Sequence, residues 1–381
     1  MVRCAKLFRQ ILKFSYFLVD TSDMNCMETS KASEEQPCVT WLLSVKNNLP
    51  FLRQTLQSIH CQTYRNHKLL VWDDCSTDGT LKELQRWVPE LIPGKIFSGR
   101  SLRLGASLAF LVEQADTELC ARIDGDDINF PQRLQRQVAF MQAHPEVGAL
   151  GSLTEHIDDH GNPRSTSWYY PLDDAGIRWR SRWQASLCHP TVMFRRSVVL
   201  AAGNYRDFQV EDLDLWMRMS LITEFHNLAE PLVQYRRYDS SLTGQVGDFY
   251  PLDLKAATLN APVLFSGIPD STRALNLWRA SHIHRPDPAG RLSPLGALDA
   301  FRNLKSLVNA GVAFARQVGK PGDYFLNTDL CKDQLYSMRR RFFENCGLAK
   351  VYAVRAHLAA ARSRTQSPTA QPAELQPKSV Q

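Results

Sequence analysis

The chain has 381 residues, enough for two domains or for one domain with a large appendage. Its composition, 44% hydrophobic and 22% charged, is that of an ordinary globular protein, and a formal net charge of +6 is too small to indicate nucleic-acid binding. The nine cysteines are scattered and never spaced C-x-x-C, which favours reduced thiols in a cytosolic protein over disulfides or a zinc site.

Residues 1–37 are predicted to be a basic amphipathic segment followed by a polar linker. In the first eighteen residues, cations alternate with large apolar side chains and no acid interrupts them. At helical spacing this pattern indicates a segment that lies on an anionic membrane surface. The open alternative is that translation starts at Met24 or Met27. No apolar run reaches the length of a membrane-spanning helix.

From residue 38 to residue 243, strands alternate with helices. Apolar runs predict strands at 39–45, 68–72, 96–97, 119–123 and 147–153. Apolar residues at helical spacing predict helices at 48–59, 80–88, 106–115, 130–143 and 209–221. Ser76 or Thr77 is expected to cap the second helix. This alternation predicts an α/β fold with a mostly parallel sheet flanked by helices.

The remaining chain is predicted to be a helical region over 244–362 and a disordered tail over 363–381. Helical patterns separated by proline and glycine run to about residue 361, and a basic stretch near their end carries Arg339–Arg341 beside Phe342 and Phe343. The tail is rich in serine, threonine, glutamine and proline.

An acidic cluster, Asp124-Gly-Asp126-Asp127, ends the predicted strand 119–123. Carboxylates this close repel one another unless a cation lies among them, and Mg²⁺ or Mn²⁺ prefers such oxygen ligands. The alternative is a solvated acidic turn. Asp74 also follows a strand, so it and Asp124 are expected to meet at the carboxyl edge of the sheet, where ligands bind. Neither a G-x-G-x-x-G nor a P-loop motif is present.

The region from Val39 to Thr243 resembles the family-2 glycosyltransferases, inverting nucleotide-sugar enzymes of the Rossmann-like GT-A fold. Motifs similar to those of the family follow in its order: Ser44–Asn47, Val71–Thr80, Arg122–Asp127, Pro131–Leu134, His189–Arg196 and Glu211–Trp216. The resemblance implies a GT-A domain over 38–243 with a C-terminal helical extension.

The same resemblance implies a role for each matched residue. Asp126 is the expected principal ligand of Mg²⁺ or Mn²⁺, with Asp124 contacting the ion through water or the ribose, and Asp212 is the expected general base. The donor-binding residues implied are Ser44, Asn47, Asp74 (for a uracil N–H), Arg122, Asp124 and Asp127. The acceptor-side residues implied are His189, Glu211 and Trp216.

Each of these roles has a structural alternative. Asp127 could cap the turn that follows it, Glu211 and Asp212 could be acids favoured at a helix N-terminus, and His189 could be a buried histidine. Trp168, Tyr169 and Trp183 could stack on sugars or pack in the core.

Two positions depart from the family's pattern. Lys46 stands where the family often has an aromatic residue that stacks on the base, and Tyr238 replaces a frequent histidine after a Tyr-Arg pair. We expect the first change to weaken base stacking and the second to remove a phosphate or metal contact. Neither is expected to touch the base or the metal ligands.

Taken together, the motifs predict an inverting transferase that moves a sugar from a UDP-sugar to a saccharide or lipid-linked saccharide acceptor, in the cytoplasm or at the inner face of the plasma membrane. One alternative is a sugar-nucleotide nucleotidyltransferase, which would need a glycine-rich basic loop after the first strand. A second is a non-catalytic sugar-nucleotide-binding protein, which would be expected to have lost Asp124, Asp126 or Asp212.

Overall fold

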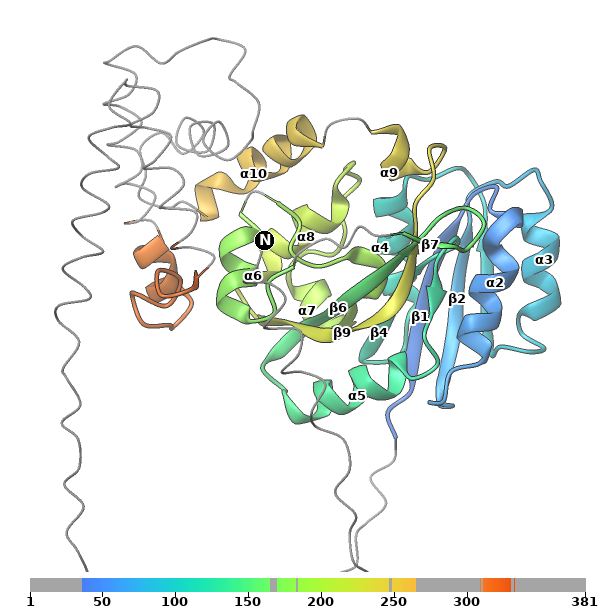
Figure 1. Ribbon diagram of the computed structural model, residues 1–381, viewed down its shortest axis with the longest axis horizontal. Coiled ribbons are helices and arrows are strands. Elements are labelled where there is room, and N and C mark those ends of the chain that lie inside the picture. Colours follow the sequence, from blue (N-terminus) through green and yellow to red (C-terminus); the bar gives the residue numbers. More distant parts are fainter. Residues whose placement is uncertain are drawn as a thin grey trace, which may run out of the picture. The chain divides into compact units, whose positions relative to one another are not determined.

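The computed structural model describes residues 36–164, 170–182, 184–246, 249–264, 309, 311–329 and 332. These residues form a nine-stranded sheet with helices on both faces (Figure 1). The strand order is β3-β2-β1-β4-β8-β6-β9-β5, and β7 pairs with β6 at the side.

Four parallel strands make up the first half of the sheet, as the sequence predicts. They are β1 (Val39–Val45), β2 (His67–Asp73), β3 (Gly94–Ser98) and β4 (Leu119–Asp124). β1 lies between β2 and β4, with Val45 opposite Asp73 and Ser44 opposite Asp124. The register therefore brings the ends of β2 and β4 to one edge of the sheet, one on each side of β1.

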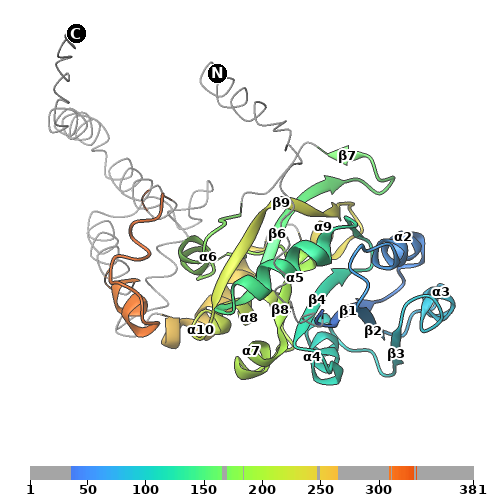
Figure 2. The same cartoon turned by 90° about the horizontal axis from the view of Figure 1, so that it is seen from below.

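Helices cover both faces of this parallel half. They are α2 (Leu49–His60), α3 (Thr80–Trp87), α4 (Leu104–Gln114) and α5 (Arg133–Ala143). Successive strand residues face opposite ways, so Trp41 and Leu43 pack in a core with α2, α3 and α5, whereas Leu42 packs in a core with α4. Figure 2 shows α4 across the sheet from α2 and α5. Each buried leucine contributes about 1.5–3 kcal/mol.

α3 begins at Thr80, as predicted, but its cap differs from the predicted one, and α5 begins later than predicted. α3 is preceded by Gly79, whose φ of 100° suits glycine, and the Thr80 amide donates to Asp78 Oδ1 at 2.9 Å. The predicted cap by Ser76 or Thr77 is therefore wrong. α5 begins at Arg133 rather than at residue 130, because Phe130 to Gln132 form the turn before it.

The second half of the sheet is mixed. Its strands are β5 (Ile128–Asn129), β6 (Val147–Ile157), β7 (Pro163–Arg164), β8 (Met193–Arg195) and β9 (Glu224–Arg236). β8 runs antiparallel to both β4 and β6, while β6 and β9 pair in parallel through several register shifts. β6 extends four residues beyond the predicted end, to Ile157. β8 and β9 were not predicted.

The remaining elements are helical. They are α6 (Asp174–Arg180), the 3₁₀ turn η2 (His189–Thr191), α7 (Arg196–Ala201), α8 (Glu211–Met219), α9 (Leu242–Gln245) and α10 (Tyr250–Leu264). α6, α8 and α10 share a third core with Phe314 and Phe325. The domain limits given above remain a prediction, but these parts of the C-terminal region pack directly on α8.

Several predicted features lie outside the described residues: the basic segment 1–18, Trp168, Tyr169, Trp183, most helices beyond residue 264, the arginines at 339–341 and the tail. Among the described residues, no helix is long and apolar enough to cross a membrane.

Candidate active site

The acidic cluster lies in a tight turn at the carboxyl end of β4. A side chain at Gly125 would place its Cβ 2.7 Å from Val45 Cγ1, so only glycine fits there. Thr55 of α2 donates its hydroxyl to the carbonyls of Gly125 and Asp127, at 2.9 and 2.8 Å. A buried threonine on the packed face of a helix thus fixes the path of the acidic turn.

Arg236, the last residue of β9, and Tyr238, two residues beyond it, hold the cluster from the other side. Arg236 donates its amide to Asp127 Oδ1 and its Nε to the Asp126 carbonyl, both at 2.8 Å. Tyr238 donates its hydroxyl to Asp126 Oδ2 at 2.8 Å, so the expectation that this position touches no metal ligand is wrong.

The electrostatics of the cluster suit a divalent cation. One oxygen each from Asp124, Asp126 and Asp127 lie within 4.8 Å of one another. Burial, and then the charge of Asp124, raise the pKa of Asp126 to about 6. Burial and the charges of Asp126 and Asp124 also raise the pKa of Asp127 well above its usual value. A cation among three oxygen donors would relieve this repulsion, so the residues fit Mg²⁺ or Mn²⁺.

Two predicted donor-binding residues lie beneath the site rather than in it. Arg122 is buried and forms an ion pair with Asp124. Burial alone would lower the pKa of Arg122, but the charges of Asp124 and Glu211 raise it. Asp127 is fully buried, and its Oδ1 accepts from Arg236 across 109 residues of sequence. Arg122 and Asp127 therefore support the turn instead of contacting a donor, and Asp127 does not cap the turn that follows it.

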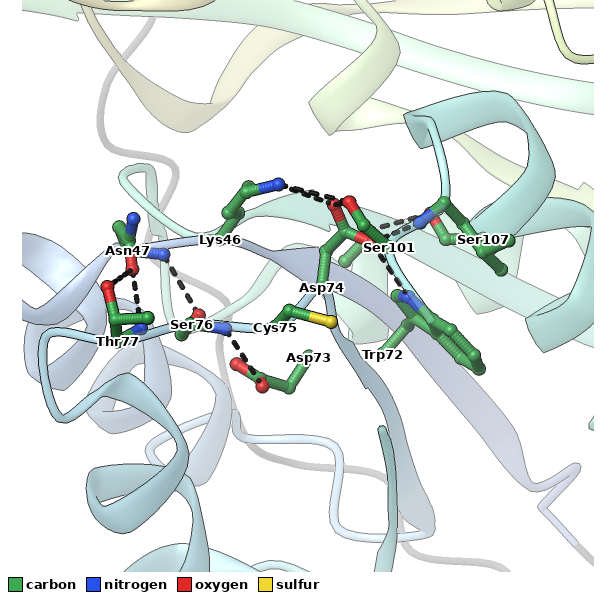
Figure 3. A network of polar contacts seen from close by, with 12 residues as sticks. Lys46, Asn47, Trp72, Asp73, Asp74, Cys75, Ser76, Thr77, Ser101 and Ser107 are labelled. Atoms are coloured by element: carbon green, nitrogen blue, oxygen red, sulfur yellow. Dashed lines mark hydrogen bonds and ion pairs between the residues drawn. The ribbon is translucent and has the colours of Figure 1, made fainter. Parts of the chain in front are cut away.

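Asp74 lies at the end of β2, across β1 from the acidic cluster. Figure 3 shows Lys46 and Ser101 meeting its carboxylate, with Lys46 Nζ 3.2 Å and Ser101 Oγ 2.8 Å from Oδ2. The Leu102 amide and, at 3.4 Å, Trp72 Nε1 donate to Oδ1. Lys46, expected to matter only through lost stacking, thus touches the residue that is predicted to read the base.

Ser44 and Asn47 are the predicted donor-binding residues at the end of β1. Ser44 Oγ lies 2.8 Å from Ser107 Oγ of α4. Asn47 has a φ of 50°, in the left-handed region that asparagine tolerates. The backbone amide of Asn47 donates to Ser76 Oγ at 2.9 Å, and its side-chain Oδ1 accepts from the backbone amide of Thr77 at 2.8 Å (Figure 3). Asn47 therefore joins the end of β1 to the turn after β2. Its contact with the donor stays a prediction.

The start of α8 carries the candidate base. Asp212 is partly exposed, whereas Glu211 is buried with Oε1 3.4 Å from His189 Nδ1. Burial raises the pKa of Asp212, and it raises that of Glu211 to about 7. Burial and then the charge of Arg122 lower the pKa of His189 to about 3, so its ring is neutral. His189 Nε2 lies 3.0 Å from Tyr205 Oη.

Trp216 does not line the acceptor side. Its indole is fully buried in the core with α4 and packs edge-on against His189, with ring centroids 6.0 Å apart. The acceptor-side role given to Trp216 is wrong, because its position one turn after Asp212 faces the core. His189 is buried, as its structural alternative predicts, and its Nδ1 lies 3.4 Å from Glu211 Oε1.

Sequence reasoning missed Thr55, and it gave Arg236 no role and Tyr238 the wrong one. The available signals were a polar residue on an apolar helix face and the dense Tyr-Arg-Arg-Tyr run at 235–238. Neither signal identifies a partner 70 to 112 residues away.

Comparison with known proteins identifies the family of this chain. The sequence profile described as Glycosyl transferase family 2 matches residues 40–201. EpsE of Bacillus subtilis, named as a glycosyltransferase, is 32% identical over 48% of this chain and 66% of its own length. The amylovoran biosynthesis glycosyltransferase AmsE of Erwinia amylovora is 33% identical over 49% of this chain and 70% of its own length. The chain thus spans about two thirds of these relatives.

The fold agrees with this match. The crystal structure of S. aureus TarS 1–349 in complex with UDP-GlcNAc superposes with a TM-score of 0.53 and 16% identity, covering 83% of this chain and 91% of that one. At this identity the likeness concerns the fold, which is GT-A. The profile match and the similarity to AmsE show that the chain belongs to glycosyltransferase family 2 and is an enzyme of that class.

Proposed function

We propose that the protein transfers a sugar from a UDP-sugar to a saccharide or lipid-linked saccharide, with inversion, in the synthesis of a cell-surface polysaccharide. The observation that carries this proposal is the position of the acidic cluster. It lies at the carboxyl edge of the sheet, across β1 from Asp74, and the charges of Asp124 and of Glu211, the residue before Asp212, both raise the pKa of Arg122. The name of AmsE and the UDP-GlcNAc bound to TarS are consistent with it.

Asp126 and Asp124 would hold a Mg²⁺ or Mn²⁺ ion. Such an ion neutralises charge that develops on a nucleoside diphosphate as it leaves. Arg122 forms an ion pair with Asp124, and Tyr238 fixes the orientation of Asp126 through its hydrogen bond. Metal-binding carboxylates that are oriented in this way bind more tightly.

Asp212 is the proposed general base. The acceptor hydroxyl oxygen attacks C1 of the donor sugar while Asp212 accepts its proton. The bond from C1 to the diphosphate oxygen breaks, and its electron pair leaves with the diphosphate. Because burial raises the pKa of Asp212, its carboxylate is a stronger base than an exposed aspartate.

The alternatives have less support. A nucleotidyltransferase would need a glycine-rich basic loop after β1, and residues 44–50 contain no glycine. A non-catalytic binding protein would not be expected to keep Asp124, Asp126 and Asp212.

The function is tested by incubating the protein with UDP-, GDP- and dTDP-sugars and Mn²⁺ and measuring donor hydrolysis. We expect UDP-sugar hydrolysis that EDTA abolishes, with the released sugar first appearing, by NMR, in the anomer opposite to the donor. Retention of configuration would contradict the mechanism, and turnover of GDP-sugars alone would contradict the proposed donor.

We further propose that the enzyme works at the cytosolic face of a membrane. The support is the sequence pattern of residues 1–18 and the basic stretch at 339–343. Each cation near an anionic leaflet contributes on the order of 1 kcal/mol, screened by salt. We expect the protein to float with anionic vesicles at low salt and not with neutral ones. Binding that ignores lipid charge, or no binding, would contradict this location.

A further inference from the structure

Three polar groups from separate segments converge beside the end of β2. Lys46 follows β1, Asp74 follows β2, and Ser101 precedes α4. Lys46 Nζ lies 3.2 Å from Asp74 Oδ2 and 3.1 Å from Ser101 Oγ, and that hydroxyl lies 2.8 Å from the same Oδ2 (Figure 3). The three groups therefore form a small triangle of one acceptor and two donors.

The two oxygens of the Asp74 carboxylate have different partners. Oδ1 accepts from the Leu102 amide and the Trp72 indole, which are fixed parts of the fold. Oδ2 accepts from Lys46, whose side chain is 53% exposed, and from the exposed Ser101. Oδ2 is thus the oxygen at which a mobile donor can be exchanged for a donor on a ligand.

The carboxylate remains an acceptor at neutral pH. Burial alone would raise the pKa of Asp74, but hydrogen bonds from Leu102, Ser101 and Lys46 lower it below its usual value. A ligand that faces Oδ2 must therefore present an N–H or O–H group.

From this arrangement we propose that Lys46 and Ser101 select the base of the donor, and that they select uracil or thymine. Lys46 and Ser101 lie side by side next to Oδ2. Once Lys46 moves away from Ser101, an acceptor with a donor on each side is complementary to the imide edge of these bases, where an N–H lies between two carbonyls. Guanine offers one carbonyl followed by two N–H groups, and cytosine turns an acceptor nitrogen toward Oδ2. Sites built to hydrogen-bond one pattern reject another because buried groups are left unpaired.

The proposal rests on the nucleotide-sugar function above and assigns Lys46 a role in place of stacking. Lys46 Nζ lies against Oδ2, where the imide N–H of the base would bind. When the base binds, the Lys46 ammonium moves to an adjacent base carbonyl while Ser101 donates to the other. A competing role for Lys46 would be to contact the diphosphate, which would make its effect independent of the base.

The test is calorimetric titration of the full chain with UDP, dTDP, CDP and GDP in the presence of Mn²⁺. We expect UDP and dTDP to bind more tightly than CDP and GDP. Lys46→Met should weaken the binding of UDP and dTDP about tenfold, which is the contribution of one charge-assisted hydrogen bond. The affinities for CDP and GDP should be nearly unchanged. Ser101→Ala should act in the same direction. Lys68→Met is the matched control, because Lys68 is ion-paired with Asp116 at the opposite end of β2.

Two results would overturn the proposal alone. One is an equal loss for all four nucleotides in Lys46→Met, which would place the ammonium on the diphosphate. The other is a preference for UDP that neither variant reduces. A wild-type protein that prefers GDP, or binds no nucleotide, would contradict the UDP-sugar function as well, so the two failures are distinguishable.

Discussion

Asp212 and Glu211 are adjacent acids with different surroundings, and this difference decides which one is suited to accept a proton from an acceptor. Glu211 is buried against His189, while Asp212 is partly exposed and makes its hydrogen bond to its neighbouring amide, from Leu213 to Oδ1 at 2.7 Å. Asp212 can therefore meet a substrate hydroxyl. Glu211, with a pKa raised to about 7, is better placed to orient His189 and the start of α8.

Asp212→Asn is expected to keep donor binding and lose transfer. The substitution removes a proton acceptor and little volume, and general bases typically contribute about 10²–10⁴-fold to rate. Turnover is measured by UDP release and donor affinity by calorimetry on the same sample. If both quantities fall together, Asp212 is a structural or donor-binding residue.

Tyr238→Phe is expected to weaken Mn²⁺ binding by about tenfold, because partners of metal-binding carboxylates typically contribute that much or more. The free Mn²⁺ signal in electron paramagnetic resonance reports the affinity without reference to activity. Tyr64→Phe is the matched control, since Tyr64 also donates its hydroxyl, to the Pro37 carbonyl at 2.5 Å, away from the acidic turn. An unchanged Mn²⁺ affinity would show that the phenol does not orient Asp126.

The strands and helices that the sequence predicts well are those with local signals. β1, β2 and β4 are apolar runs with polar residues at their ends, and their predicted limits are correct to within one residue. β9 is mixed in character, contains Pro231 and pairs with β6 through register shifts, so no alternation marks it. The hydrogen bonds that hold the acidic turn come from Arg236, and its partners become neighbours only when β9 joins the sheet. Sequence patterns therefore locate the acids but not the groups that hold them.

The first turn of α8 carries both the candidate base, Asp212, and a buried structural acid, Asp214. Asp214 is fully buried and pairs with Arg218 at 2.7 Å and with Arg206 at 3.3 Å. Asn260 of α10 donates to Asp214 Oδ1 at 2.9 Å. This contact joins the C-terminal region to the helix on which Asp212 lies.

Asn260→Ala is expected to lower the free energy of unfolding by about 1–3 kcal/mol, since it removes a donor from a buried carboxylate. Thermal and urea unfolding measure the loss, and Mn²⁺ affinity should not change. Leu259→Ala is the control, because the neighbouring Leu259 is 53% exposed and its removal should cost within about 0.5 kcal/mol. Equal effects of the two variants would mean that α10 contributes no specific support to α8.

The acidic turn joins parts of the molecule that are far apart in sequence. Thr55 of α2, the end of β4 and Arg236 at the end of β9 meet there, and Arg236 also donates to Gln54 Oε1 at 2.7 Å. Carboxylates that repel one another are thus held together by the packing of the whole domain. The fold bears the electrostatic cost of the site in the absence of a cation, which links metal binding to global stability.

This link predicts how stability depends on pH. The pKa of Asp126 is about 6 in the folded protein against an ordinary 3.8. Between these values the folded chain holds a proton that the unfolded chain has released, so the stability of the metal-free protein falls as pH rises through this window and stays lower above it. Asp126→Asn removes this term, and in EDTA the variant should melt at a higher temperature than the wild type at pH 7.5.

The advantage of Asp126→Asn should shrink at pH 4.5, where the wild-type carboxyl is protonated in the folded state. Mn²⁺ at pH 7.5 should raise the melting temperature of the wild type and have little effect on the variant, because the ion relieves a repulsion that the variant lacks. Scanning calorimetry over this pH range, with and without Mn²⁺, measures both effects. A difference in melting temperature that is constant with pH would show that the carboxylates of this turn are not under electrostatic strain in the metal-free fold.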